Sequence, residues 1–255
     1  ASPYGTFKVG NAGDAANAVD DITPSAFEEA NGSGSGTYTT DFGSGMEGSM
    51  SLGYAKSDIM GTGISFDYTY YPNLDGSTNN EKAATGSTAA GAAANSAQSA
   101  NVKIDMSALP AIGGELAGLV VTLGYEESDA SVNTMQGKEG ATVAVNYATG
   151  PVKVGYQKKA YQPETTTIAA KEFYKDDIIG IAYAINDSLA VSYNVIESVK
   201  HAEAGIDVEQ KTKAINAAYT IGGLTIGFQD AKTSHAGYVT DTDDDTRTLS
   251  LKTAF

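Results

Sequence analysis

Apolar and polar residues alternate along almost the whole chain, and this two-residue period constrains the fold more than any other feature. In the segment ISFDYTY (64–70), Ile, Phe and Tyr occupy one parity, and Ser, Asp and Thr occupy the other. A two-residue period is that of a β-strand, and no helical stripe of comparable length occurs. The sequence therefore predicts an all-β fold of about twelve strands, each with one apolar face and one face of small or polar residues.

The connections between these segments alternate strictly between short and long. Short connections are expected around Ser57–Gly63, Ala108–Gly118, Ala148–Pro151, Ile185–Ser188 and Ile221–Gly223. Long polar connections are expected around Tyr71–Asn101, Glu126–Gly140, Lys158–Lys175, Glu197–Gln210 and Asp230–Thr246. Residue alternation alone would also suit a soluble sandwich. The alternating connections instead place every long loop at one end of an antiparallel meander, as in outer-membrane barrels.

Composition argues against several classes of function. The 255 residues are 41% hydrophobic and contain no run of about 18 apolar residues, so no transmembrane helix is predicted. The net charge is −15 with a single arginine, which makes nucleic acid an unlikely partner. With no cysteine and two histidines we expect no disulfide framework, no zinc site, no cofactor and no enzyme. The first residues, ASPYGTFKV, carry no signal peptide, which we expect to be either removed or never present.

Tyrosines gather at the ends of the predicted strands, on the apolar parity. Those just before short connections are Tyr147, Tyr183 and Tyr219, and those just before long ones are Tyr68, Tyr70, Tyr125 and Tyr156. Two rings of outward tyrosines would form aromatic girdles at the two membrane interfaces. The alternative is the ordinary preference of tyrosine for strands.

One long segment, residues 11–45, interrupts the strand pattern. It reads NAGDAANAVDDITPSAFEEANGSGSGTYTTDFGSG, with a short helix expected at Ser25–Glu29 and a Gly/Ser run after it. A connection of this length is usually functional or disordered.

In three features the chain resembles the general porins of Gram-negative bacteria, most closely those of alphaproteobacteria. They are the stretch YGTFKVGNAGDAANAVDD (Tyr4–Asp21), the series of hairpins, and a last strand that carries Leu249 and Leu251 and ends in Phe255. The resemblance implies a single domain over residues 1–255, a transmembrane antiparallel β-barrel in the outer membrane. Such barrels have sixteen strands when complete, so about twelve would be present here, with some four missing before Tyr4. A genuine twelve-stranded barrel would have to close through Tyr4–Gly10, which is short for a spanning strand of ~9–11 residues.

The resemblance also implies that segment 11–45 folds into the barrel and narrows its lumen. Its acidic residues would face basic residues of the opposite wall, and a narrow ring of carboxylates attracts cations and repels anions. The acids concerned are Asp14, Asp20, Asp21, Glu28 and Glu29, and the lysines of lumen-facing parity are Lys8, Lys103, Lys153 and Lys252. The alternative for both sets is ordinary solvated side chains.

Two features near the C-terminus bear on the membrane. The run DTDDD places Asp241, Asp243 and Asp245 at alternate positions, but it lacks the glycine and the final acid of a calcium loop. It is either a weak surface site for a divalent ion that bridges lipid phosphates or a solvated acidic loop. The last strand, with Leu249, Leu251 and Phe255 on the lipid side, resembles the signal by which barrels are recognised for insertion, although Thr253 departs from it.

The predicted function is passive diffusion of small hydrophilic solutes and ions, with a mild preference for cations because the chain is acidic. The expected partners are outer-membrane lipid and lipopolysaccharide, the barrel-assembly machinery and two further copies in a homotrimer. The alternatives are a substrate-specific channel, a non-conducting structural or adhesive barrel, and a soluble β-protein.

Overall fold

The computed structural model describes residues 4–10, 13–28, 30, 50–72, 96–109, 114–129, 137–164, 172–202 and 205–253. These residues form twelve strands: β1 (Thr6–Gly10), β2 (Ser51–Lys56), β3 (Ile64–Tyr71), β4 (Ala97–Asp105), β5 (Leu119–Ser128), β6 (Glu139–Thr149), β7 (Val152–Gln162), β8 (Glu172–Asn186), β9 (Leu189–Ala202), β10 (Val208–Ile221), β11 (Leu224–Ser234) and β12 (Asp243–Thr253). Single 3₁₀ turns lie at η1 (Asn17–Val19), η2 (Ile59–Gly61), η3 (Met106–Ala108) and η4 (Ala236–Tyr238).

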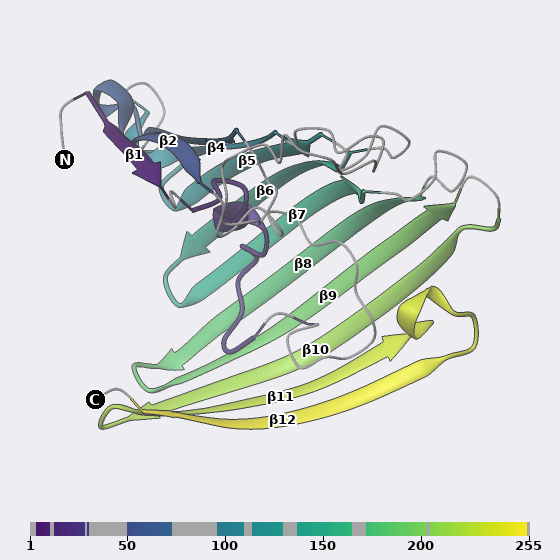
Figure 1. The fold of residues 1–255 in the computed structure, drawn as a ribbon. Helices are drawn as coiled ribbons and strands as arrows, with labels where there is room; N and C mark the ends of the chain where they lie inside the picture. The colour runs from purple at the N-terminus through teal and green to yellow at the C-terminus, as the bar shows by residue number, and fades with distance from the viewer. Residues whose placement is uncertain are drawn as a thin grey trace.

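The strands form one antiparallel sheet in which every strand pairs with its neighbours in the sequence, from β1 through to β12. This confirms the predicted all-β meander of about twelve strands. Figure 1 shows a strongly curved sheet of inclined strands, with β1 and β12 at its two edges and the segment that follows β1 crossing its concave side. Within the described strands, no ladder joins β12 to β1.

The cross-strand register separates the two faces of the sheet completely. Asn216 of β10 lies opposite Gln229 of β11, while the next pair along, Ala217 and Phe228, points the other way. On the concave face the largest buried side chains are mostly polar, among them Gln157, Lys159, Gln210, Asn194, Asn216 and Gln229. The convex face exposes apolar side chains, including Ile179, Ile181, Ile215, Leu249 and Leu251. This distribution is the reverse of that in a soluble protein and matches a barrel that faces lipid outside and water inside.

The strands run further toward the long loops than the sequence predicts. Strand β7 continues to Gln162 and β8 begins at Glu172, inside the connection expected at Lys158–Lys175. Strands β4, β9 and β10 likewise extend into the long connections expected beside them. Apolar alternation stops there, but ion pairs between strands replace it on the convex face. One of them joins Lys158 to Asp177 at 2.8 Å. Backbone pairing therefore extends beyond the hydrophobic pattern from which the strand ends were predicted.

The short helix expected at Ser25–Glu29 is absent from its described part. Residues 26–28 form bends, and the only helical turn of the described segment is η1. The amide of Ala26 donates to Ser192 of the sheet, while Ser25 Oγ donates to the carbonyl of Glu28, so side-chain and tertiary contacts replace the helical hydrogen bonds.

The strand-end tyrosines lie on the convex face, as their parity predicts. Tyr147, Tyr183 and Tyr219 are 41%, 45% and 41% exposed, and Tyr70, Tyr125 and Tyr156 are exposed to a similar degree. Among the described residues, no helix has the length and hydrophobicity needed to cross a membrane.

Candidate functional site

Residues 13–28 lie along the concave face of the sheet and are held there by side chains of the wall. At the first end, Asn101 of β4 donates to the carbonyl of Ala15 at 2.6 Å, and the amide of Ala15 donates to Ser99 Oγ at 3.1 Å. The hydroxyl of Tyr71 donates to the carbonyl of Gly13 at 2.8 Å. We call residues 13–28 the inner segment.

Gln157 of β7 holds the middle of the inner segment. Its Nε2 donates to the carbonyl of Val19 at 2.9 Å and also to that of Asp20, and its Oε1 accepts from the amide of Ile22 at 3.1 Å. Gln157 is fully buried. One amide side chain therefore satisfies both kinds of backbone group of a segment that has almost no secondary structure of its own.

The far end of the inner segment crosses β8 to β11. Asn194 donates to the carbonyl of Pro24 at 2.9 Å, and Ser192 Oγ accepts from the amide of Ala26 at 2.9 Å. The approach is close because the wall carries glycine at Gly180, where a Cβ would lie 2.6 Å from the oxygen of Pro24. The segment thus lies in a groove floored by glycine and bounded by amides.

Lys159 is the electrostatic anchor of the inner segment. Its Nζ lies 2.9 Å from Asp20 Oδ1 and 3.0 Å from Asp21 Oδ1, and the lysine side chain is completely buried. Asp176 lies directly opposite Lys159 on β8, is also fully buried, and accepts from Ser198 Oγ at 2.5 Å. Three carboxylates therefore surround one ammonium group. Burial, opposed by Lys159 and reinforced by Asp21, raises the pKa of Asp20 to about 7.

The other predicted acids are placed separately. Asp14 Oδ1 accepts from the amide of Ala16 at 2.8 Å, and burial, partly offset by a hydrogen bond from Ser99, raises the pKa of Asp14. Glu28 Oε1 lies 3.4 Å from the ammonium of Lys252. Glu29 lies outside the described residues.

Among the described residues, Lys252 is the one predicted lysine that forms an ion pair with a predicted acid. Lys8 lies 3.8 Å from Asp67 of β3. Lys103 and Lys153 line a cavity between the inner segment and the wall, and the described residues of its lining include no acid. The described acids Asp20 and Asp21 thus pair with the strand that the segment covers, and not with a distant wall.

Lys159 was not among the predicted site residues, because the long connection expected at Lys158–Lys175 placed it in a loop. The signal that would have found it is parity: Lys153, Gly155, Gln157 and Lys159 share one face of β7. The amide row of Gln157, Asn194 and Gln229 was visible as polar residues on the lumen parity, but their partners lie far away in the sequence.

The C-terminal residues occupy the outer surface. Leu249 and Leu251 are 72% and 66% exposed on the convex face, and Phe255 lies outside the described residues. Asp243 and Asp245 belong to β12, where Asp245 lies 3.6 Å from Lys232, while Asp241 precedes the strand with φ +60°. Among the described residues, no group of three or more His, Cys, Asp or Glu side chains could hold a metal ion.

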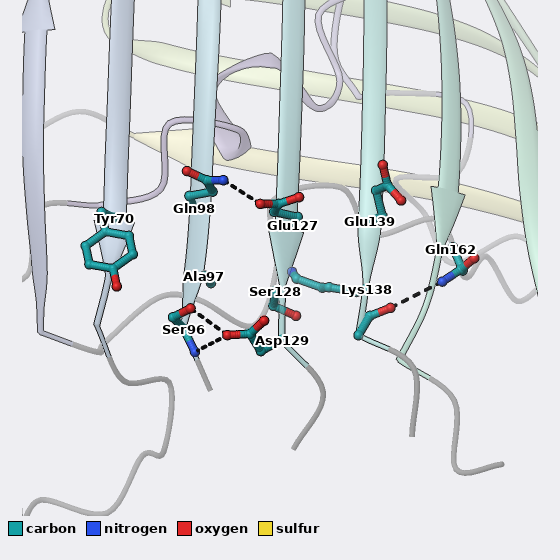
Figure 2. Close-up of a pocket in the computed structure, with 11 residues that line it drawn as sticks. Tyr70, Ser96, Ala97, Gln98, Glu127, Ser128, Asp129, Lys138, Glu139 and Gln162 are labelled. Carbon is teal, nitrogen blue, oxygen red and sulfur yellow. Dashed lines mark hydrogen bonds between the residues drawn. The ribbon is translucent and has the colours of Figure 1, made fainter. Parts of the chain in front are cut away.

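A polar pocket of about 360 Å³ lies at the long-loop ends of β3 to β7. Figure 2 shows Gln98 turned toward Glu127, and Ser96 bonded to Asp129. Tyr125 donates to Glu127 at 2.6 Å and Glu139 at 3.3 Å. Every carboxylate of the pocket has a donor, so its hydrogen bonds stabilise the rim of the wall.

The curved meander, apolar outside and polar inside with a segment bound to its inner face, defines a fold of the outer-membrane β-barrel class. Solved structures of this class match nearly the whole chain. A porin matches with a TM-score of 0.63 at 13% identity, over 98% of this chain and 79% of that chain. The outer-membrane channel DcaP of Acinetobacter baumannii matches with a TM-score of 0.62 at 12% identity, over 98% and 71%.

A third similar structure is OmpT, an outer-membrane protein of Vibrio cholerae, with a TM-score of 0.60 at 13% identity over 98% of this chain and 74% of that chain. Likeness at such low identity establishes the fold alone. No protein-family model and no curated protein matches the sequence.

Proposed function

We propose that this chain forms a channel of the general porin type, through which small hydrophilic solutes and ions diffuse passively across the outer membrane of a Gram-negative bacterium. It would act without enzymatic activity or cofactor. The observation that carries the proposal is the inner segment, bound by buried polar side chains to the concave face of a sheet whose convex face is apolar. The stretch Tyr4–Asp21, which contains the start of this segment, supports the alphaproteobacterial type.

Selection would rest on size and charge at the inner segment. The segment lies inside the curved sheet and fills part of the cross-section of the lumen, so it narrows the path for solutes. The net charge of −15 favours cations in a water-filled lumen of low-dielectric walls, and we propose a mild cation preference on this ground. Ion pairs reduce that preference locally, since Asp20, Asp21 and Glu28 each have a lysine partner.

A substrate-specific channel is the second candidate. It is favoured by the cavity of about 500 Å³ between the inner segment and β4 to β7, because pockets of this size hold small ligands. A specific channel would show saturable transport, whereas a general one would not.

The proposed partners follow from the outer surface. Exposed Ile179, Leu249 and Leu251 suit lipid tails, and the charged pairs beyond the tyrosines suit lipopolysaccharide headgroups. By resemblance we also propose a homotrimer and insertion by the barrel-assembly machinery, with no role for nucleic acid.

Conductance in planar bilayers tests the proposal. The native protein extracted from the membrane should give stable, water-filled channels whose conductance scales with bulk salt. A tenfold KCl gradient should give a reversal potential of the sign for cation preference. A protein that gives no conductance, or that partitions into buffer without detergent, would contradict the channel assignment, and a reversal potential of the opposite sign would contradict only the cation preference.

A further inference from the structure

A cavity of about 500 Å³ lies between the inner segment and the wall formed by β4 to β7. The inner segment contributes apolar side chains to it, namely Val19, Ile22 and Pro24. The wall contributes Lys103 from β4 and Lys153 from β7, together with Val120 and the polar side chains of Asn101, Thr122 and Asn146. We call this space the segment–wall cavity.

The charged groups that line the segment–wall cavity are both cationic. Within the described part of the chain, neither Lys103 nor Lys153 lies within ion-pair distance of a carboxylate. Asp105, two residues from Lys103 in the strand, accepts hydrogen bonds from Ser107, and its charge acts on Lys103 only beyond ion-pair distance. Two lysines from separate strands thus line one space, and neither has an ion-pair partner among the described residues, in a chain whose net charge is −15.

Asp14 lies outside the cavity lining, and the other described acids of the inner segment do not compensate these lysines because they are already paired. Asp20 and Asp21 both turn to Lys159, and Glu28 turns to Lys252. The same ion pairs that fix the inner segment therefore leave a local excess of positive charge beneath it. Unscreened like charges at one place raise the local concentration of an oppositely charged solute.

We propose that the segment–wall cavity binds a small organic carboxylate with an apolar body. The carboxylate would lie between the ammonium groups of Lys103 and Lys153, and the body would pack against Val19, Ile22 and Pro24. Ammonium groups bind carboxylates through charge-assisted hydrogen bonds, and the apolar side of the lining, formed by the inner segment, favours a hydrocarbon body over a hydrated inorganic anion. This inference deepens the proposed channel function by naming a solute class, and it rests on that function for its physiological meaning.

The site is compatible with a cation preference of the channel as a whole. Preference among inorganic ions depends on the summed charge of the lumen, whereas organic acids would be selected by two lysines and an apolar surface at one place. The channel would then pass small cations freely and retain organic acids transiently.

Blockade of potassium current by benzoate tests the inference. In the native protein, benzoate should reduce the current in a saturable way, and neutral benzamide should do so much more weakly. Lys103→Gln and Lys153→Gln should each raise the half-blocking concentration by about tenfold, the order expected for one lost charge-assisted contact. The matched control is Lys8→Gln, a lysine of lumen-facing parity outside the cavity, which should leave the blockade unchanged.

Calorimetric titration of benzoate into the detergent-solubilised protein gives a second measurement that needs no conductance. Equal effects of benzoate and benzamide, or a blockade and binding heat that both lysine variants leave intact, would overturn the inference. Loss of all conductance with binding preserved would overturn only the proposed channel function. Normal conductance without benzoate binding would overturn only the carboxylate site.

Discussion

The ammonium of Lys159 lies 2.9 Å from Asp20 Oδ1, across 139 residues of sequence, and the lysine is completely buried. This contact fixes the middle of the inner segment to β7 at the place where the backbone of the segment has few hydrogen bonds of its own. A buried ion pair contributes little net stability compared with apolar packing, but it fixes one arrangement, since any other leaves a charge buried alone. We interpret Lys159 as the residue that sets where the inner segment lies.

Lys159→Met should destabilise the protein strongly, because it leaves Asp20, Asp21 and Asp176 near one another without their cation. The expected loss in the free energy of unfolding is about 3–5 kcal/mol, the range for a broken buried pair. The matched control is the adjacent Lys158→Met. Lys158 pairs with Asp177 on the exposed convex face, so its loss should cost about 0–1 kcal/mol. Urea titration of the protein folded in lipid vesicles measures both, and equal losses would refute the anchoring role.

The stability of the folded protein should depend on pH through Asp20. Burial raises the pKa of this carboxyl from 3.8 to about 7, so between these values the folded chain binds a proton that the unfolded chain does not. Stability from this group therefore falls as pH rises from about 4 to about 7 and is constant beyond. Asp20→Asn should flatten the unfolding free energy across that window, whereas Asp187→Asn, in an exposed turn, should not. The same slope in the Asp20 variant would show that other groups produce it.

Gly180 should tolerate no larger side chain. A Cβ there would lie 2.6 Å from the carbonyl oxygen of Pro24 and 2.8 Å from Nδ2 of Asn194. Gly180→Val should therefore lift the inner segment from the wall, lower stability by about 1–3 kcal/mol and increase cleavage of the segment by added protease. Gly114→Val is the control, because a Cβ at Gly114 meets no atom within 4 Å. Unchanged cleavage in the Gly180 variant would mean that the segment does not depend on this contact.

The strands could be predicted from the sequence because apolar residues that face outward and polar residues that face inward alternate along each of them. The alternation in ISFDYTY became β3, and the alternating connections became hairpins in the predicted order. Strand ends were predicted less well because the alternation changes where charged pairs such as Lys158 and Asp177 replace apolar contacts. The ladder continues there without a hydrophobic signal.

The inner segment could be predicted as an inserted element, but its contacts could not. Its length and its acids are visible in the sequence. The partners of those acids could not be predicted, because they lie far away in the sequence. Lys159 and Asp20, for example, are 139 residues apart. The lysines Lys103 and Lys153 were found by parity, and only the structure places them in a cavity with the segment.

The orientation of β12 gives a direct test of the membrane-facing surface. Leu249 is 72% exposed on the convex face, while its neighbour Thr248 points to the concave face opposite Gln229. Leu249→Lys should lower the free energy of unfolding in lipid vesicles by about 2–4 kcal/mol if the residue lies near the bilayer midplane, and by less near an interface. Thr248→Lys places the same charge one residue away on the water-filled side, so it should be nearly neutral.

Folding titrations in vesicles compare the two β12 variants under one condition. A large loss for Leu249→Lys beside a small one for Thr248→Lys assigns the convex face to lipid. Equal losses would mean that both faces are equally dry, as in a packed soluble core, and a neutral Leu249→Lys would mean that the convex face meets water. Either result would contradict the channel model, because a water-filled barrel requires one wet and one lipid-facing side on every spanning strand.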